Sequence, residues 1–337
     1  MLPIASSDEV GSLGILHLKR LWSAALAQRS GGRVRRAEDG ALDALVIHAL
    51  GLGLHQTFQH LHAEAPSLTE FEAWIVAIAG RPDPLHVARL NAAIEGQPAP
   101  EPIQRWLAAI EESEPVLAPE ELRFWDENGY VVLRGAVPEA ARAAAEAAIW
   151  NHVGADPAAP DSWYARTGRH GIMVELIQHR ALEVNRRTER IHRAFAQLWG
   201  TADLWVTADR CGFHPPQRAG HPFPGPDLHW DLDFSAPLAF GTQGILYLTD
   251  TPAEQGALTL VPGFHRRLPE WLASLPPGAD PQQQDLHALG SIPVGARAGD
   301  MVIWRDALPH GSRPNLGTRP RIVQYINLFR APPGRSP

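Results

Sequence analysis

Apolar residues recur at intervals of three and four over roughly the first 110 residues, a spacing that places them on one face of a helix. Examples are Leu18, Leu21, Trp22, Ala25 and Leu26, followed by Leu42, Leu45, Val46, Ala49 and Leu50. Glycine and proline interrupt the pattern near Gly31, Pro66 and Pro82, and Ser67 stands three residues before Glu70, as is typical of a helix start. We therefore predict four or five helices here, forming an all-α domain over residues 1–115.

The pattern becomes mixed after Pro119. Helices are predicted over residues 120–128 and 139–151, with two more between 181 and 198. Short apolar runs separated by proline and glycine predict strands over residues 130–133, 204–207, 228–234, 244–249, 257–261, 301–304 and 322–329. Strands this short and this regularly spaced favour an antiparallel barrel or a double-sheet sandwich, in a second domain over residues 119–332.

Composition narrows the possible functions. With 45% hydrophobic and 20% charged residues, the chain has enough apolar material to fold, which excludes disorder throughout. The formal charge of -7 and the absence of a long basic run argue against nucleic acid or an anionic membrane as a partner. No run of residues matches a membrane-spanning helix, and the first thirty residues lack a signal-peptide pattern. A single cysteine, Cys211, fits a reducing compartment, so we expect a cytoplasmic protein.

The clearest candidate chemistry lies in His229-Trp230-Asp231, within a predicted strand. Side chains two residues apart on a strand point to the same face, so His229 and Asp231 are expected to converge inside a barrel mouth. His310, just after the run at 301–304, is the best candidate for a third ligand. Two histidines and one carboxylate form the facial triad that holds non-haem Fe(II) and leaves positions open. The alternative is a chance tripeptide, since the chain has sixteen histidines.

An arginine at a fixed distance strengthens this hypothesis. Arg321 lies eleven positions after His310, at the start of an apolar strand whose inner face would place the guanidinium in the same barrel. A guanidinium suits a two-point grip on a carboxylate, and the Ser312 hydroxyl could bind the same group. Arg319, two residues away on the same face, is the competing candidate, and an ordinary surface arginine is the simpler alternative.

Further motifs surround these residues in a consistent order, at 124–135, 254–258, 261–266, 299–301, 310–315 and 319–321. Together they make residues 121–330 resemble the phytanoyl-CoA dioxygenase family of Fe(II)- and 2-oxoglutarate-dependent oxygenases. The resemblance implies an α+β fold whose core is a double-stranded β-helix, also called a jelly roll, with flanking helices. It stops short of the first domain.

The resemblance also implies roles for individual residues. His229, Asp231 and His310 would bind Fe(II), while Arg321 and Ser312 would bind the distal carboxylate of 2-oxoglutarate. Tyr247 would be a further 2-oxoglutarate contact. O2 would be the second co-substrate, with hydroxylation of a C–H bond of a small molecule as the default outcome and desaturation, ring formation or epimerisation left open. The carboxylate of Asp231 disfavours halogenation, because related halogenases carry a small residue there.

Substrate contacts are expected among basic and aromatic residues near the barrel mouth, although a structural role is the alternative for each. The candidates are Arg166, His170, Arg210, His214 and Trp304. In the first domain, His55, Gln59 and His62 share a helix face, for which a polar surface is favoured over a metal site. That domain could serve in dimerisation, in docking to a protein or carrier, or as a lid. Two alternatives to the oxygenase stay open: a non-catalytic jelly-roll protein that binds a small molecule, and a cupin-type metalloenzyme without 2-oxoglutarate.

Overall fold

The computed structural model describes residues 3–29, 31, 37–165 and 168–333. The chain divides into two compact units. The first comprises the residues up to Ser113, the segment Trp199–Asp209 and the chain from Leu328 on, and the second comprises Glu114–Leu198 and Arg210–Asn327. The division differs from the predicted domains at residues 119–332, because two segments of that range fall in the first unit.

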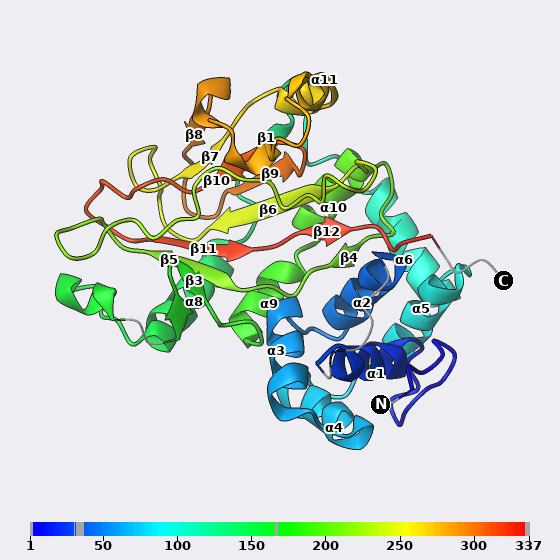
Figure 1. The fold of residues 1–337 in the computed structure, drawn as a ribbon. Helices are drawn as coiled ribbons and strands as arrows, with labels where there is room; N and C mark the ends of the chain where they lie inside the picture. Colours follow the sequence, from blue (N-terminus) through cyan, green and yellow to red (C-terminus); the bar gives the residue numbers. More distant parts are fainter. Residues whose placement is uncertain (1–2, 30, 32–36, 166–167, 334–337) are drawn as a thin grey trace. The chain divides into compact units, whose positions relative to one another are not determined.

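The first unit is built mainly of helices around one apolar core. Its described residues form α1 (Leu18–Arg29), α2 (Ala37–Ala49), α3 (Leu54–Glu64), α4 (Leu68–Ala79), α5 (Pro84–Glu95) and α6 (Glu101–Glu112) (Figure 1). The helix start expected at Ser67 is present: its hydroxyl accepts from Glu70 N–H, and the Glu70 carboxylate accepts from Ser67 N–H at 2.8 Å. The described residues of this unit form six helices, where four or five were predicted, and two of them, α2 and α3, lie between the breaks at Gly31 and Pro66.

The described elements within residues 1–115 are all helices, as predicted, but two segments from later in the chain add strands to this unit. It contains a two-stranded antiparallel sheet, in which β12 (Leu328–Phe329) pairs with β4 (Trp205–Val206). Trp205 belongs to the helical core, and the Arg89 guanidinium lies 4.2 Å from the centre of its ring. Burial of this indole among the helices explains why a segment far along the chain joins the first unit.

The second unit contains two antiparallel sheets. The large sheet has the order β1-β9-β6-β11-β5-β3-β2, and the small one the order β10-β7-β8. The strands are β1 (Tyr130–Leu133), β2 (Arg169–His170), β3 (Met173–Val174), β5 (Cys211–His214), β6 (Thr242–Tyr247), β7 (Leu258–Leu260), β8 (Ile292–Val294), β9 (Met301–Arg305), β10 (His310–Gly311) and β11 (Arg321–Tyr325). Alternate residues of the large sheet, among them Ile245, Val302 and Val323, share one buried cluster with Leu258 and Leu260 of the small sheet, so the two sheets pack face to face.

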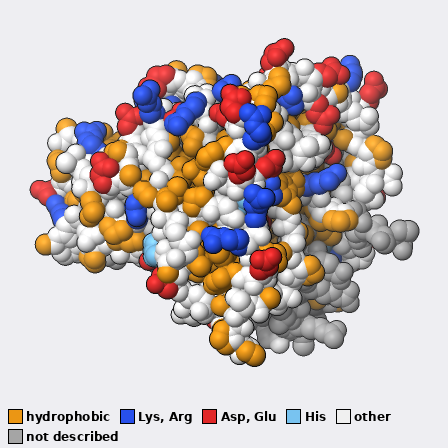
Figure 2. Space-filling view, turned by 90° about the horizontal axis from the view of Figure 1, so that it is seen from above, with side chains coloured by type: hydrophobic (Ala, Val, Ile, Leu, Met, Phe, Trp, Pro, Cys, Tyr) orange, Lys and Arg blue, Asp and Glu red, His pale blue; other side chains and the backbone are white. Residues whose placement is uncertain are grey.

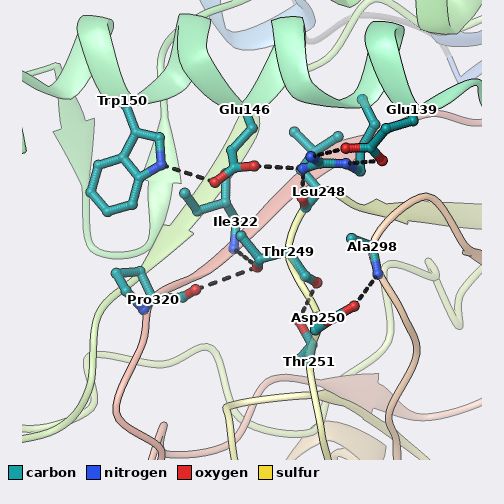
Figure 3. A network of polar contacts seen from close by, with 11 residues as sticks. Glu139, Glu146, Trp150, Leu248, Thr249, Asp250, Thr251, Ala298, Pro320 and Ile322 are labelled. Atoms are coloured by element: carbon teal, nitrogen blue, oxygen red, sulfur yellow. Dashed lines mark hydrogen bonds and ion pairs between the residues drawn. The ribbon is translucent and has the colours of Figure 1, made fainter. Parts of the chain in front are cut away.

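Helices cover the other face of the large sheet. They include α8 (Glu139–Val153) and α9 (Arg180–Arg186), and the unit also contains α7 (Pro119–Asn128), α10 (Glu189–Trp199) and α11 (Leu268–Ser274). Figure 3 shows how α8 is attached: Arg142 bonds Glu139, Glu146 and the carbonyl of Leu248 just after β6. The two ion pairs raise the pKa of Arg142, with the Glu139 hydrogen bond as the largest cause. The end of β6 is therefore tied to the helix layer.

Three strand predictions need correction. The strand expected over residues 228–234 does not form. In this range only His229 pairs, in an isolated bridge with His310 of the two-residue strand β10. The run at 322–329 splits into β11 and β12, since β11 pairs with β5 and β6 while β12 pairs with β4. Strand β5 was not predicted, because Gly212 and His214 interrupt its apolar pattern.

Candidate metal centre

Three side chains that can ligate a metal meet in the second unit. The ligating atoms of His229, Asp231 and His310 all lie within 4.8 Å of one another. Asp231 Oδ1 is 3.6 Å from His229 Nε2, and Asp231 Oδ2 is 3.4 Å from His310 Nε2. The described residues contain no other group of three or more histidine, cysteine or acidic side chains this close together.

Backbone pairing brings the two histidines together across 81 positions of sequence. Each donates its N–H to the carbonyl of the other at 2.9 Å, so His229 and His310 stand directly opposite on adjacent segments. Side chains of such a pair project from the same face, and the two imidazole ring centres are 4.8 Å apart. On the other side, β10 pairs with β7, which places His310 opposite Leu260 in the small sheet. The backbone of His310 is thus paired on both sides, with His229 and with Leu260.

The imidazoles are oriented by backbone carbonyls. His229 Nδ1 lies 2.7 Å from the Asp227 carbonyl, and His310 Nδ1 lies 3.1 Å from the Leu308 carbonyl. A carbonyl oxygen can only accept, so each Nδ1 carries the proton and donates it. The Nε2 lone pairs are therefore free and directed toward Asp231, which is the arrangement that metal-bound histidines require.

The carboxylate is held in its charged form. When His310 is protonated, its hydrogen bond is the main cause that lowers the pKa of Asp231, and a hydrogen bond from Gln243 and the nearby His229 lower it further. Gln243 Nε2 donates to Asp231 Oδ2 at 2.6 Å. The Asp231 side chain is 58% exposed while that of His310 is 7% exposed, so the cluster opens to solvent on the side of Asp231.

These residues fit a divalent iron ion. Neighbouring ligands of an octahedral ion with bonds of ~2.1 Å are about 3 Å apart. The contacts of Asp231 with His229 and His310, 3.6 and 3.4 Å through different carboxylate oxygens, are a few tenths of an ångström longer, and the three ligating atoms all lie within 4.8 Å of one another. Two neutral imidazoles and one carboxylate are also the donor set preferred by ferrous iron, and three ligands leave positions open.

Arg321 is the largest of the described side chains that are less than 2% exposed, with 1% of its surface exposed. Its Nη1 donates to the Gly256 carbonyl at 2.7 Å, whereas Nε and Nη2 are buried without a hydrogen-bond partner among the described residues. A guanidinium remains charged in proteins, and an anion that accepts from these two donors would stabilise the buried charge. Arg319, the competing candidate, is exposed.

Strand β7 connects this guanidinium to the histidine cluster. Gly256, which accepts from Arg321, lies two residues before β7, and Thr259 and Leu260 of β7 are opposite Gly311 and His310. Ser312 is buried and follows His310 by two positions. The segment from Gly256 to Leu260 thus contacts Arg321 at one end and His310 at the other.

His214 lies beside Arg321 and away from the open side. The two residues are direct partners in the β11–β5 ladder, and a Cβ on Gly256 would be 2.7 Å from His214 Nδ1. Burial lowers the pKa of His214 to about 2, with contributions from Arg321 and then Arg169. His214 Nδ1 is buried without a partner in the described residues. The ring is thus a neutral neighbour of the guanidinium.

Tyr247 is fully buried, and its hydroxyl is committed to the backbone. The hydroxyl donates to the Val294 carbonyl at 3.0 Å and accepts from Leu258 N–H at 2.9 Å. Burial raises the pKa of this phenol. The contacts join β6 to β7 and β8, so the side chain ties the large sheet to the small one.

The remaining substrate candidates are dispersed. Trp304 is buried, with its ring 5.2 Å from that of His310 and its indole N–H unpaired in the described residues. His170 is exposed on β2 at the edge of the large sheet. Arg210 pairs with Glu175 at 3.6 Å and precedes β5, at the end opposite His214. Arg166 lies outside the described residues. Of these candidates, the structure therefore places Trp304 beside the cluster.

Other surfaces give weaker signals. His55 and Gln59 are exposed on α3, whereas His62 is half-buried, with its ring 6.2 Å from that of Phe58. Figure 2 shows basic and acidic side chains intermixed on the face drawn, without an extended area of one charge. No helix in the described ranges has both the length and the apolar character needed to cross a bilayer.

Sequence reasoning missed two residues that support the cluster. Gln243 binds the Asp231 carboxylate, and the Asp227 carbonyl orients His229 while its side chain contacts His287 Nε2 at 2.8 Å. A signal for Gln243 was present: it alternates with Ile245 and Tyr247, both of the buried cluster, and is the polar member of that series. The role of a carbonyl such as that of Asp227 leaves no trace in residue identity.

Comparisons with known proteins agree on one family. The family model for phytanoyl-CoA dioxygenase (PhyH) matches residues 125–323. A Dictyostelium discoideum protein named "Putative phytanoyl-CoA dioxygenase" is 23% identical over 184 residues, which is 43% of this chain and 53% of the relative. The chain thus spans about half the length of that curated relative.

A comparison with solved structures matches the chain to the non-heme α-ketoglutarate-dependent carbocyclase SnoK of nogalamycin biosynthesis, among others. It has 20% identity and a TM-score of 0.45, over 66% of this chain and 91% of SnoK. HygX from Streptomyces hygroscopicus, solved with nickel and 2-oxoglutarate, has 17% identity and a TM-score of 0.45, over 64% and 88% of the two chains.

Proposed function

The chain belongs to the phytanoyl-CoA dioxygenase family, and we propose that it is an Fe(II)- and 2-oxoglutarate-dependent oxygenase acting on a small molecule. The observation that carries this proposal is the convergence of His229, Asp231 and His310 with both Nε2 lone pairs facing the carboxylate. The buried, unpaired donors of Arg321 support the second half of the proposal, a carboxylate-bearing co-substrate.

Each residue has a defined task in this scheme. His229, Asp231 and His310 hold the iron; the Asp227 and Leu308 carbonyls keep both imidazoles in the tautomer that ligates. Arg321 binds the distal carboxylate of 2-oxoglutarate through Nε and Nη2, and Ser312 adds a hydroxyl hydrogen bond. When bound, ferrous iron with 2-oxoglutarate and O2 supplies the oxidising power for removing hydrogen from a C–H bond, with release of succinate and CO2. Hydroxylation of an unactivated C–H bond of an amino-acid-like or natural-product substrate is the proposed outcome.

The remaining assignments follow from this scheme. The two face-packed antiparallel sheets support a double-stranded β-helix as the core of the oxygenase domain, over residues 119–332. Trp304, whose ring lies 5.2 Å from that of His310 at an angle of 50°, is the substrate contact best supported by position, with Arg166, His170, Arg210 and His214 as further candidates. The helical region over residues 1–115 is proposed to mediate dimerisation or docking, and the protein is proposed to be cytoplasmic.

The test is anaerobic addition of Fe(II) and then 2-oxoglutarate to metal-free protein. A visible charge-transfer band that saturates with 2-oxoglutarate is expected, followed by 2-oxoglutarate-dependent succinate formation on admitting O2. Asp231→Ala is the matched control, in which both signals are expected to be lost. Absence of the band in folded wild-type protein would favour a binding protein, while oxygen uptake independent of 2-oxoglutarate would favour a cupin-type enzyme.

A further inference from the structure

Among the described residues, Gln243 is the residue of the large sheet whose side chain donates a hydrogen bond to a proposed iron ligand. Its Nε2 donates to Asp231 Oδ2 at 2.6 Å, a short contact typical of a hydrogen bond to a charged acceptor. Asp231 lies outside any strand: His229 forms a single bridge with His310, and the backbone of Trp230 is bonded to the side chain of Gln282. These contacts hold the backbone before Asp231, and the Gln243 amide holds the carboxylate itself.

The orientation of the Gln243 amide follows from the chemistry of its partner. An ionised carboxylate only accepts hydrogen bonds, so the NH2 end of the amide must face Asp231. The other end, Oε1, is buried without a partner among the described residues. No competing donor in that region therefore draws the amide away from the carboxylate.

The location of Gln243 on the sheet makes this contact rigid. Gln243 is the second residue of β6, directly opposite Trp304 of β9, and Trp304 is in turn opposite Tyr130 of β1. Its neighbours on the same face of β6, Ile245 and Tyr247, are buried in the core. The amide is thus held by a strand with partners on both sides, while the carboxylate that it binds is on a loop.

We infer that Gln243 is a positioning residue that fixes the Asp231 carboxylate for metal binding. Gln243 donates to Oδ2, the oxygen that lies 3.4 Å from His310 Nε2, and this contact favours Oδ1, 3.6 Å from His229 Nε2, as the oxygen that binds the ion. A carboxylate that offers one oxygen uses one coordination position, which leaves more positions for the co-substrate and O2. This inference rests on the proposed function for the identity of the metal.

The test compares Gln243→Met with Gln324→Met in metal-free protein. Methionine has nearly the shape of glutamine and no donor. Gln324 is also a strand glutamine with two hydrogen bonds, to Asn185 and the Leu182 carbonyl, but it contacts no ligand. Titration calorimetry with Mn(II) reports affinity, the visible spectrum of the Co(II)-loaded protein reports coordination, and thermal unfolding of the metal-free protein reports stability.

Gln243→Met is expected to bind Mn(II) about 10- to 100-fold more weakly and to change the Co(II) spectrum. Gln324→Met is expected to lower the unfolding temperature while keeping the wild-type Mn(II) affinity. In an Asp231→Ala background, Gln243→Met is expected to cause no further loss. Mn(II) affinity within twofold of wild type and an unchanged Co(II) spectrum in Gln243→Met would overturn the inference, as would an equal loss of affinity in the Asp231→Ala background.

The outcomes separate this inference from the proposed function. If wild-type protein binds Mn(II) but forms no succinate from 2-oxoglutarate with Fe(II), the proposed function fails and the role of Gln243 stands or falls on the affinities alone. If wild-type protein binds metal and produces succinate but Gln243→Met behaves like wild type, only the role of Gln243 fails.

Discussion

Gly311→Ala is the sharpest test of how the backbone builds the ligand cluster. A Cβ at position 311 would lie 2.3 Å from the Asp227 carbonyl oxygen, 2.5 Å from its carbon and 2.9 Å from Leu228 N. All three atoms are backbone, so no flexible side chain can yield, and the segment must retreat by roughly 1 Å to restore van der Waals contact. The same carbonyl accepts from His229 Nδ1 at 2.7 Å. The substitution therefore strains the group that orients a ligand.

The expected magnitude follows from two separate effects. Overpacking of this kind costs about 1–3 kcal/mol of unfolding free energy. Loss of the carbonyl that orients a ligating histidine weakens metal binding about 10- to 100-fold. We expect both in Gly311→Ala, measured by urea unfolding of the metal-free protein and by calorimetric titration with Mn(II).

Gly40→Ala is the control, because nothing lies within 4 Å of its Cβ position and alanine favours the helix that contains it. It is expected to keep the wild-type Mn(II) affinity and to be slightly more stable. A Gly311→Ala protein with wild-type stability and wild-type affinity would refute the steric argument. Lower stability with unchanged affinity would refute the link from Asp227 to His229.

Three further outcomes are expected. Arg321→Met should weaken binding of 2-oxoglutarate to the Fe(II) protein at least ~30-fold, since losing one partner of a buried charge pair costs about 2–5 kcal/mol. Its Mn(II) affinity should stay at the wild-type value, and the exposed control Arg319→Met should keep the wild-type affinity for 2-oxoglutarate. His214→Gln should make the protein less sensitive to acid. The pKa of His214 is about 2 in the folded state and near 6.5 in the unfolded state, so only the unfolded chain takes up the proton between pH 7.5 and 5.5. Over this range the unfolding free energy of wild type, measured with urea, should fall by about 1.4 kcal/mol more than that of the variant. Tyr247→Phe should cost about 1–3 kcal/mol of unfolding free energy, because the Val294 carbonyl and Leu258 N–H lose their partner. Its affinity for 2-oxoglutarate should stay within twofold of wild type, and a larger drop would identify Tyr247 as a co-substrate contact.

The strands and helices that the sequence predicted well are those with a strong local pattern. Residues 130–133 form β1 as expected, and 139–151 lie within α8 (Glu139–Val153). Periodicity sufficed there because each element buries one continuous face. The capping residues Ser67 and Glu70 act within a single turn, so their pattern also sufficed.

The predictions failed where pairing, and not local pattern, decides the structure. The apolar alternation of residues 228–234 indicated a strand, but a strand needs a partner, and β10 provides one bridge only. β10 itself, with two residues, is too short for any periodicity to reveal. Trp205 likewise belongs to the first unit because it packs in a core formed by helices from the N-terminal part of the chain.

The predicted ligands converge although the strand that was expected to carry two of them does not form. The prediction of His229 and Asp231 used a strand geometry that the chain does not adopt after His229, yet their ligating atoms converge with that of His310. Convergence is achieved by supports that sequence reasoning did not include: the reciprocal His229–His310 backbone pair, the Asp227 carbonyl admitted by Gly311, and the Gln243 amide. Two of these supports are backbone groups, which every residue type supplies. Residue identity therefore indicates the ligands but not these two supports. It follows that substitutions at Gly311 and Gln243 test the site more stringently than substitutions at the ligands, because they alter metal affinity only if the supporting geometry is as described.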